Sequence, residues 1–382
     1  MALRNAMERC STRRFTTYWA TRAKLSQKAQ DLATLRQATV FSITGADEFF
    51  SDLRGKISAL EDMANTDVLS AKIAVARMKR YLADPAQRIS LQDLVISETE
   101  KAYAQLNGPR FPVTPTSLSS ADISPRLKAY EATVETVLRL MICGAHWGEQ
   151  QHEGPLLRCF KRIADQRPFQ ASNVVLERLA RYPALLLLYG AGIAAITRQN
   201  YSLLKGLFGL KVKYDGYKPE KIVAAAISDQ VVLDRDIQKQ ALGSRYSPLS
   251  DRVFEVLRDP LREYLPSDGE YDRTFDWFEY LLCLSHCDAS VSRSDLEQLR
   301  AENPNFTLFA SVGRFGWKGG YDGEPSIQAE TELIAKQAYP EKVAAVLKAG
   351  FFESGGQLND DKYREVKAAF DRHVKNVRMQ WT

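Results

Sequence analysis

The sequence has no apolar run long enough to cross a bilayer as a helix, which takes roughly 18 residues or more. Its longest apolar run extends from Tyr182 to Ile196 and includes two glycines, so a buried helix is favoured over a membrane span. The first residues carry several arginines but no apolar segment and no small-residue cleavage site, which argues against a secretory signal. We therefore expect a cytoplasmic protein with no membrane partner.

Cysteine is scarce as well. The chain of 382 residues has five: Cys10, Cys143, Cys159, Cys283 and Cys287. An odd and widely spaced set offers no disulfide framework and suits a reducing compartment.

Positive charge is concentrated near the N-terminus. Residues 1–40 hold eight of the 52 basic side chains and two of the 47 acidic ones, so the remaining 342 residues are close to neutral. A nucleic-acid-binding domain normally shows a basic surface interleaved with aromatic residues, and we do not expect nucleic acid as a partner. The basic segment is interpreted as a solvated surface, with an anionic ligand or partner as the alternative.

The N-terminal segment alternates between strand and helix patterns. Residues 15–19 and 39–43 are rich in β-branched and aromatic residues, which is typical of strands. An amphipathic helix pattern at 25–36 separates them, and a turn ending at Asp47 precedes a further helix to residue 63. This order predicts two parallel strands with a right-handed crossover, a short Rossmann-like βαβα remnant.

Beyond residue 67 the pattern is helical almost throughout, with expected helices at 67–83, 90–106, 125–143, 183–208 and 219–242 among others. We therefore predict a mainly α protein in which a large helical domain follows the βαβα remnant. A stretch rich in proline and serine interrupts the helical pattern and is interpreted as a linker. The predicted parts are 1–63 for the remnant, 64–106 for a helical connector, 107–125 for the linker and 126–382 for the helical domain.

No complete active site can be assembled from the sequence. The four histidines lie far from any matching nucleophile or acid, and the spacing of His146 and His152 does not suit a metal site on one helical face. Cys283 and Cys287 stand one helical turn apart in an aromatic-rich segment, which favours core positions over a metal or redox site.

Two glycine-containing segments invite a phosphate-binding interpretation. Gly190 and Gly192 follow a run of leucines, and the composition favours a buried helix over a nucleotide-binding turn, which stays open as an alternative. Residues 313–323 contain five glycines without the ending of a Walker loop, so an ordered turn or a partner-contact loop is favoured. The predicted partner-binding residues in this loop are Arg314, Trp317 and Lys318.

The N-terminal segment resembles the closing part of the SIR2-like domain, in particular the branch found in bacterial anti-phage defence proteins. The resemblance rests on the segments ALRNA (2–6), RRFTTYWA (13–20), KLS (24–26) and TGADEFF (44–50). In that family a NAD-binding Rossmann sheet finishes here and a long helical region follows. The resemblance implies that one wall of a partial nucleotide site is formed by Tyr18, Trp19, Gly45, Ala46 and Asp47.

The same resemblance implies that this chain does not complete an NAD-hydrolysing site. The family's Gly-Ala-Gly-x-Ser turn and its catalytic histidine do not precede Thr44. We expect no cofactor in isolation, with NAD bound only if a separate N-terminal half completes the domain. The expected function is a non-catalytic sensor, regulatory or oligomerisation region whose partner is a protein, either itself or a companion. The alternative is an all-helical interaction module that binds through residues 313–323.

Overall fold

The computed structural model describes two strands near the N-terminus and most of the helical remainder of the chain. The described residues are 18–21, 39–42, 71–112, 119–165, 173–213, 220–291, 312–317, 340–352 and 360–379. The chain divides into two compact units, residues 1–69 and 70–382, and each is described by itself.

In the first unit, β1 (Tyr18–Thr21) pairs in parallel with β2 (Thr39–Ser42). The register places Tyr18 opposite Thr39 and Thr21 opposite Ser42. The expected helices at 25–36 and 47–63 lie outside the described residues.

The second unit is mainly helical, as predicted. Its first helices are α4 (Ala71–Ala83), η1 (Pro85–Gln87), α5 (Arg88–Leu106), α6 (Ser120–Trp147), α7 (Gln150–Ala164), α8 (Val174–Leu179), α9 (Tyr182–Thr197) and α10 (Tyr201–Gly209). A short antiparallel pair follows, β3 (Lys211–Val212) with β4 (Lys221–Ile222). The later elements are α11 (Val223–Ala226), α12 (Asp229–Val232), α13 (Arg235–Leu242), α14 (Pro248–Leu261), α15 (Asp268–Val291), η2 (Arg314–Trp317), α18 (Pro340–Lys348) and α19 (Asp360–Met379).

Three predicted helix boundaries were wrong because capping residues override the apolar pattern. α6 begins at Ser120 rather than at 125, since Ser119 and Asp122 form a capping box ahead of Pro125. The expected helix 183–208 is divided between α9 and α10, where Asn200 caps the second helix. The expected helix 219–242 is divided by further caps at the starts of α12 and α13.

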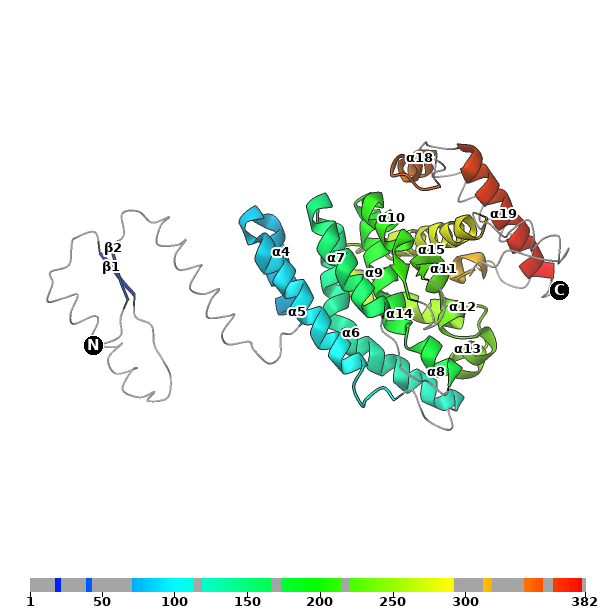
Figure 1. Cartoon of the computed structure of the whole chain (residues 1–382), viewed down its shortest axis with the longest axis horizontal. Helices are drawn as coiled ribbons and strands as arrows, with labels where there is room; N and C mark the ends of the chain where they lie inside the picture. The colour runs from blue at the N-terminus through cyan, green and yellow to red at the C-terminus, as the bar shows by residue number, and fades with distance from the viewer. Residues whose placement is uncertain are drawn as a thin grey trace. The chain divides into compact units, whose positions relative to one another are not determined.

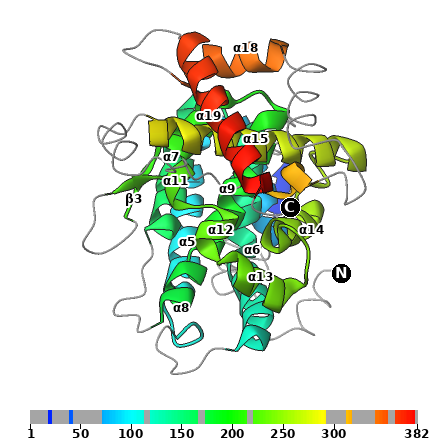
Figure 2. The same cartoon turned by 90° about the vertical axis from the view of Figure 1, so that its right-hand side faces the viewer.

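The core forms around α9, which packs against α6 and is crossed by α15 (Figures 1 and 2). Within the described residues, the stretch 174–197 is long and apolar enough to qualify as a membrane span by composition. Its most apolar part is entirely buried inside the unit, and Tyr182 through Ile196 are all buried. The apolar run is therefore the central core helix.

Two glycines of α9 let neighbouring helices approach closely. A Cβ added at Gly190 would lie 2.6 Å from Leu138 of α6, and one at Gly192 would lie 2.1 Å from Phe278 of α15. The predicted buried helix is confirmed. The nucleotide-binding turn is wrong, because both glycines lie in the middle of a helix.

The Gly192→Ala variant is expected to lower the free energy of unfolding by about 1–3 kcal/mol. Its added methyl group would strike the Phe278 ring, which is fully buried and held against Tyr189 and Phe208. Urea denaturation monitored by circular dichroism measures the change.

The matched control is Gly209→Ala, at a helical position with nothing within 4 Å of an added Cβ. Because alanine is the better helix former by about 1 kcal/mol, this change should be neutral or stabilising. Equal effects of the two substitutions would contradict the close packing of α9 on α15.

Candidate functional site

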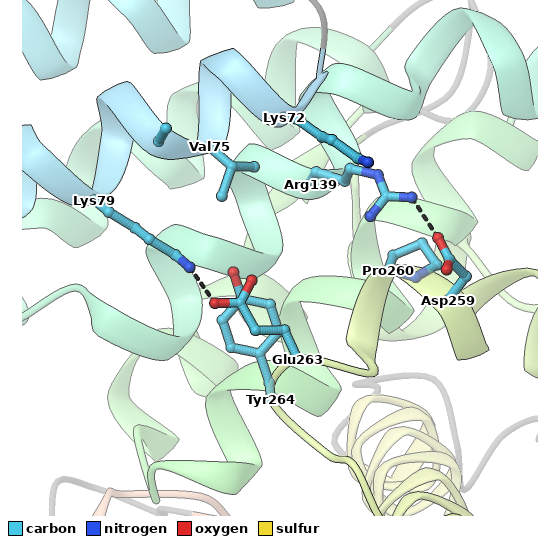
Figure 3. Close-up of a pocket in the computed structure, with 9 residues that line it drawn as sticks. Lys72, Val75, Lys79, Arg139, Asp259, Pro260, Glu263 and Tyr264 are labelled. Carbon is cyan, nitrogen blue, oxygen red and sulfur yellow. Dashed lines mark hydrogen bonds and ion pairs between the residues drawn. The ribbon is translucent and has the colours of Figure 1, made fainter.

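A pocket of about 370 Å³ opens between α4, α6 and the end of α14 (Figure 3). Lys72 and Lys79 reach it from α4 and Arg139 from α6, while Asp259 and Glu263 stand on the other side. The remaining lining is formed by Val75, Ala76, Pro260 and Tyr264. The pocket thus combines charged side chains of both signs with an apolar wall.

Ion pairs connect the two sides of this pocket. An Arg139 nitrogen lies 2.6 Å from Asp259 Oδ2, and another lies 3.2 Å from Glu135 of the same helix. Lys79 pairs with Glu263 and lies 5.9 Å from the centre of the Tyr264 ring. These contacts join α4 and α6 to the end of α14.

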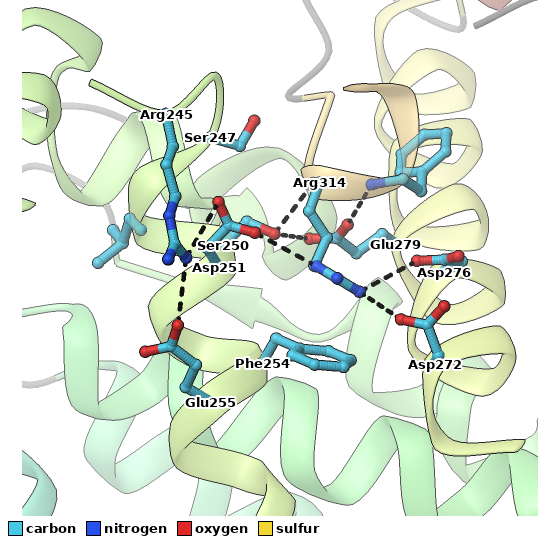
Figure 4. A network of polar contacts seen from close by, with 12 residues as sticks. Arg245, Ser247, Ser250, Asp251, Phe254, Glu255, Asp272, Asp276, Glu279 and Arg314 are labelled. Carbon is cyan, nitrogen blue, oxygen red and sulfur yellow. Dashed lines mark hydrogen bonds and ion pairs between the residues drawn. The ribbon is translucent and has the colours of Figure 1, made fainter. Parts of the chain in front are cut away.

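A second polar site surrounds Glu279 of α15, whose side chain is buried (Figure 4). Its Oε1 accepts hydrogen bonds from Ser250 Oγ at 2.5 Å and from Tyr189 Oη at 3.1 Å. Its Oε2 accepts one from the Phe315 backbone N–H at 3.3 Å. The carboxyl group therefore joins α9, α14, α15 and η2.

Burial raises the pKa of Glu279 to about 8. The hydrogen bond from Ser250 acts in the opposite direction, while the negative charges of Asp229 and Asp276 raise this pKa further. Glu279 consequently holds its proton through most of the neutral range.

The segment that precedes η2 packs directly against this carboxyl group. A Cβ at Gly313 would lie 2.1 Å from Glu279 Oε1, so a side chain at this position has no room. Ser250 Oγ accepts a hydrogen bond from the Arg314 backbone N–H at 3.0 Å, and Ser247 Oγ donates one to the Val312 carbonyl at 3.3 Å. The glycine and the two serines together fix the course of residues 312–315.

The Arg314 side chain is turned into the fold. Its guanidinium carbon lies 3.7 Å from the centre of the Phe254 ring. Its nitrogens pair with Asp272 at 2.7 Å, Asp251 at 3.4 Å and Asp276 at 3.7 Å. With 17% of the side chain exposed, Arg314 is engaged by these internal contacts and anchors residues 312–315.

The other predicted site residues are only partly placed by the structure. Tyr18 and Trp19 lie in β1, whereas Gly45, Ala46 and Asp47 lie outside the described residues. Trp317 ends η2, and Lys318 follows outside the described range.

Sequence reasoning missed the acidic face of α15. Asp272, Asp276 and Glu279 recur at intervals of four and three residues, which places them on one face of the helix. Because the segment is dominated by aromatic residues, the sequence predicts only a core helix there. An acidic stripe within a buried helix is the signal that a buried cation such as Arg314 would pair with it.

Two of the four histidines, His146 and His152, make hydrogen bonds within the fold. His146 Nδ1 lies 2.7 Å from Thr197 Oγ1, and burial lowers its pKa to about 4, with a further lowering by Arg198. His152 Nδ1 accepts a hydrogen bond from the Glu149 backbone N–H at the start of α7.

The cysteines form no metal site where the structure describes them. Cys143, Cys159, Cys283 and Cys287 are free and buried. Within the same residues, no group of three or more His, Cys, Asp or Glu side chains is arranged to hold a metal ion.

Comparison with known proteins adds no family to these observations. No family model matches the chain, and no match was found among curated proteins or solved structures. The resemblance to SIR2-like domains therefore stays a prediction from the sequence.

The Glu279→Gln variant is expected to flatten the pH dependence of stability. Between the usual carboxyl pKa of 4.5 and about 8, the folded protein keeps a proton on Glu279 that the unfolded chain releases. The stabilising contribution of this group is present in full below 4.5 and is lost as the pH rises through about 8, at a slope of at most about 1.4 kcal/mol per pH unit.

Urea unfolding at pH 5, 6, 7 and 8 would compare the variant with the unmodified protein. Glutamine cannot ionise. The free energy of unfolding of the variant should therefore rise relative to that of the unmodified protein as the pH increases. Glu255→Gln, at a side chain that is 65% exposed, serves as the control and should leave the pH profile unchanged. Parallel profiles for Glu279→Gln and the unmodified protein would show that Glu279 is not protonated in the folded state.

Proposed function

We propose that this chain is a non-catalytic helical region of a SIR2-like anti-phage defence protein, carrying the closing βαβα part of a Rossmann-like domain at its N-terminus. The single observation that supports this most is the parallel pairing of β1 with β2. Consecutive parallel strands require a crossover, usually a helix, and the 17 residues between these strands are enough for one. The order of elements is then that of a doubly wound sheet.

Catalysis is not part of the proposal. NAD hydrolysis would need the family's glycine turn and histidine, which this sequence does not contain ahead of Thr44. Tyr18, Trp19 and residues 45–47 would form only one wall of a nucleotide site, completed by residues that these 382 do not supply.

The helical unit then acts in regulation, sensing or assembly in the cytoplasm, with a protein as its partner. Its central helix is buried, and its Glu279 cluster is held by hydrogen bonds within the unit. This suits a rigid body that presents surfaces rather than one that performs chemistry. A parallel pair of strands has edges that need cover, and a second copy of the chain is one source of it.

The alternative function is an all-helical interaction module that binds through residues 313–323. The observation that favours it is the firm anchoring of residues 312–315 by Glu279, Ser250 and Arg314. Such an anchor would hold the start of the loop in a fixed place, ready for a partner. Trp317 and Lys318 would then make the contacts, since Arg314 is engaged internally.

Incubated with NAD at micromolar concentration, the purified chain is expected to release no nicotinamide above a protein-free control. The physical reason is that the sequence supplies one wall of the nucleotide site and no catalytic histidine beside it. Chromatography of the reaction products over several hours measures the release. Sustained turnover would contradict the non-catalytic assignment.

The two proposed functions place the contact surface between copies of the chain at different residues. Light scattering, which measures the size of the assembly, is expected to distinguish them. Under the SIR2-like proposal, deletion of residues 1–63 lowers the number of chains in the assembly, because the strand edges that the chains cover for one another are lost. Under the alternative, the Trp317→Ala/Lys318→Ala double variant lowers it and the deletion does not. A multimer that neither change dissociates would contradict both assignments of the contact surface.

A further inference from the structure

The pocket between α4, α6 and α14 has a distribution of charge that is not explained by the stability of the fold. Lys72 and Lys79 are seven residues apart on α4, so they lie on the same face of the helix, and Arg139 reaches the same pocket from α6 (Figure 3). Among the residues that the structure describes, Lys72 has no ion pair or hydrogen bond. Three cations therefore border one concavity, and one of them is uncompensated.

The carboxylates in this pocket are the exposed partners of their ion pairs. The side chains of Asp259 and Glu263 are 77% and 58% exposed, against 25% for Arg139 and 37% for Lys79. Pairs that are this open to water contribute about 1 kcal/mol or less to stability. A stronger anion entering from solvent can take the place of either carboxylate while the cations stay where the helices hold them.

The rest of the lining is apolar and suits an organic body attached to that anion. Val75 and Ala76 lie between the two lysines on α4, and Pro260 and the Tyr264 ring lie across from them. The volume of about 370 Å³ falls at the small end of ligand sites, which span roughly 300–1,000 Å³.

We propose that this pocket binds a small organic phosphate monoester, with Arg139, Lys72 and Lys79 holding the phosphate and the wall around Tyr264 holding the organic group. The arginine fork can donate to two phosphate oxygens, and the lysines supply further positive charge at the pocket. A phosphate monoester offers the three cations three oxygens and up to two negative charges, whereas a carboxylate offers two oxygens and one charge. The assignment does not depend on the proposed function, because it involves only side chains of the second unit.

Isothermal titration calorimetry of the full chain with phenyl phosphate tests the proposal, with phenol and benzoate as matched probes. Phenyl phosphate is expected to bind saturably, benzoate more weakly, and phenol without measurable affinity below about 10 mM. Raising the salt concentration should weaken the binding, because the cations are partly exposed.

Two substitutions with opposite expected effects distinguish a binding site from a structural one. Arg139→Gln should weaken phenyl phosphate binding by about tenfold or more, since it removes a charged donor pair. Asp259→Asn should tighten it severalfold, because it removes the carboxylate that competes for Arg139. Lys128→Ala, at an exposed lysine of the same helix outside the pocket, should leave the affinity unchanged.

Several outcomes would overturn the proposal. These are the absence of saturable binding of phenyl phosphate, equal losses in Arg139→Gln and Lys128→Ala, or weaker binding in Asp259→Asn. If the thermal transition shows that Arg139→Gln does not fold, Lys72→Ala replaces it, because Lys72 has no ion pair among the described residues whose loss would disturb the structure. Equal or tighter binding of benzoate would assign the pocket to carboxylates and overturn the choice of phosphate.

Discussion

The Glu279 carboxyl group binds together elements that lie far apart in the chain. Tyr189 of α9, Ser250 of α14 and the backbone of η2 all donate to it. A buried polar group is costly unless its partners are all in place, so this cluster tolerates only one mutual arrangement of these elements. The apolar contacts of the same helices would accept small shifts, whereas the hydrogen bonds to Glu279 would not.

The packing of α9 makes this arrangement possible. Tyr189 reaches Glu279 only because α15 crosses α9 closely, and the crossing is close because Gly192 carries no side chain against Phe278. One turn of α9 therefore supplies both the space for the neighbouring helix and the hydroxyl group that bonds to its carboxyl. Gly190, in the same turn, likewise leaves space for the close approach of α6.

The helical character of the second unit could be predicted from the sequence because apolar periodicity reports on burial, and burial dominates in helices such as α9. The breaks between helices were harder to predict. They depend on single capping side chains such as Asn200 and Ser228, whose hydrogen bonds are worth about 1 kcal/mol each and leave little trace in the apolar pattern.

The polar sites were harder still, because they join residues from distant parts of the chain. The glycines make the loop with Arg314 conspicuous in the sequence, but the requirement for Gly313 comes from Glu279, which packs against it. The pocket gave no sequence signal at all, since Lys72 and Arg139 come from separate helices and resemble ordinary surface residues. Pairwise contacts of this kind follow from the packing of helices and cannot be derived from local pattern.

The two polar sites show opposite ways in which a protein treats carboxyl groups. At Glu279 water is excluded, so the charged form is disfavoured and the group keeps its proton while serving as a fixed point of the fold. At Asp259 water is present, so the charge is well solvated and its attraction to Arg139 is largely screened. The buried carboxyl is therefore difficult to replace and the exposed one is easily exchanged. This contrast is why the Glu279 cluster is suited to holding structure and the pocket beside Arg139 is suited to receiving a ligand.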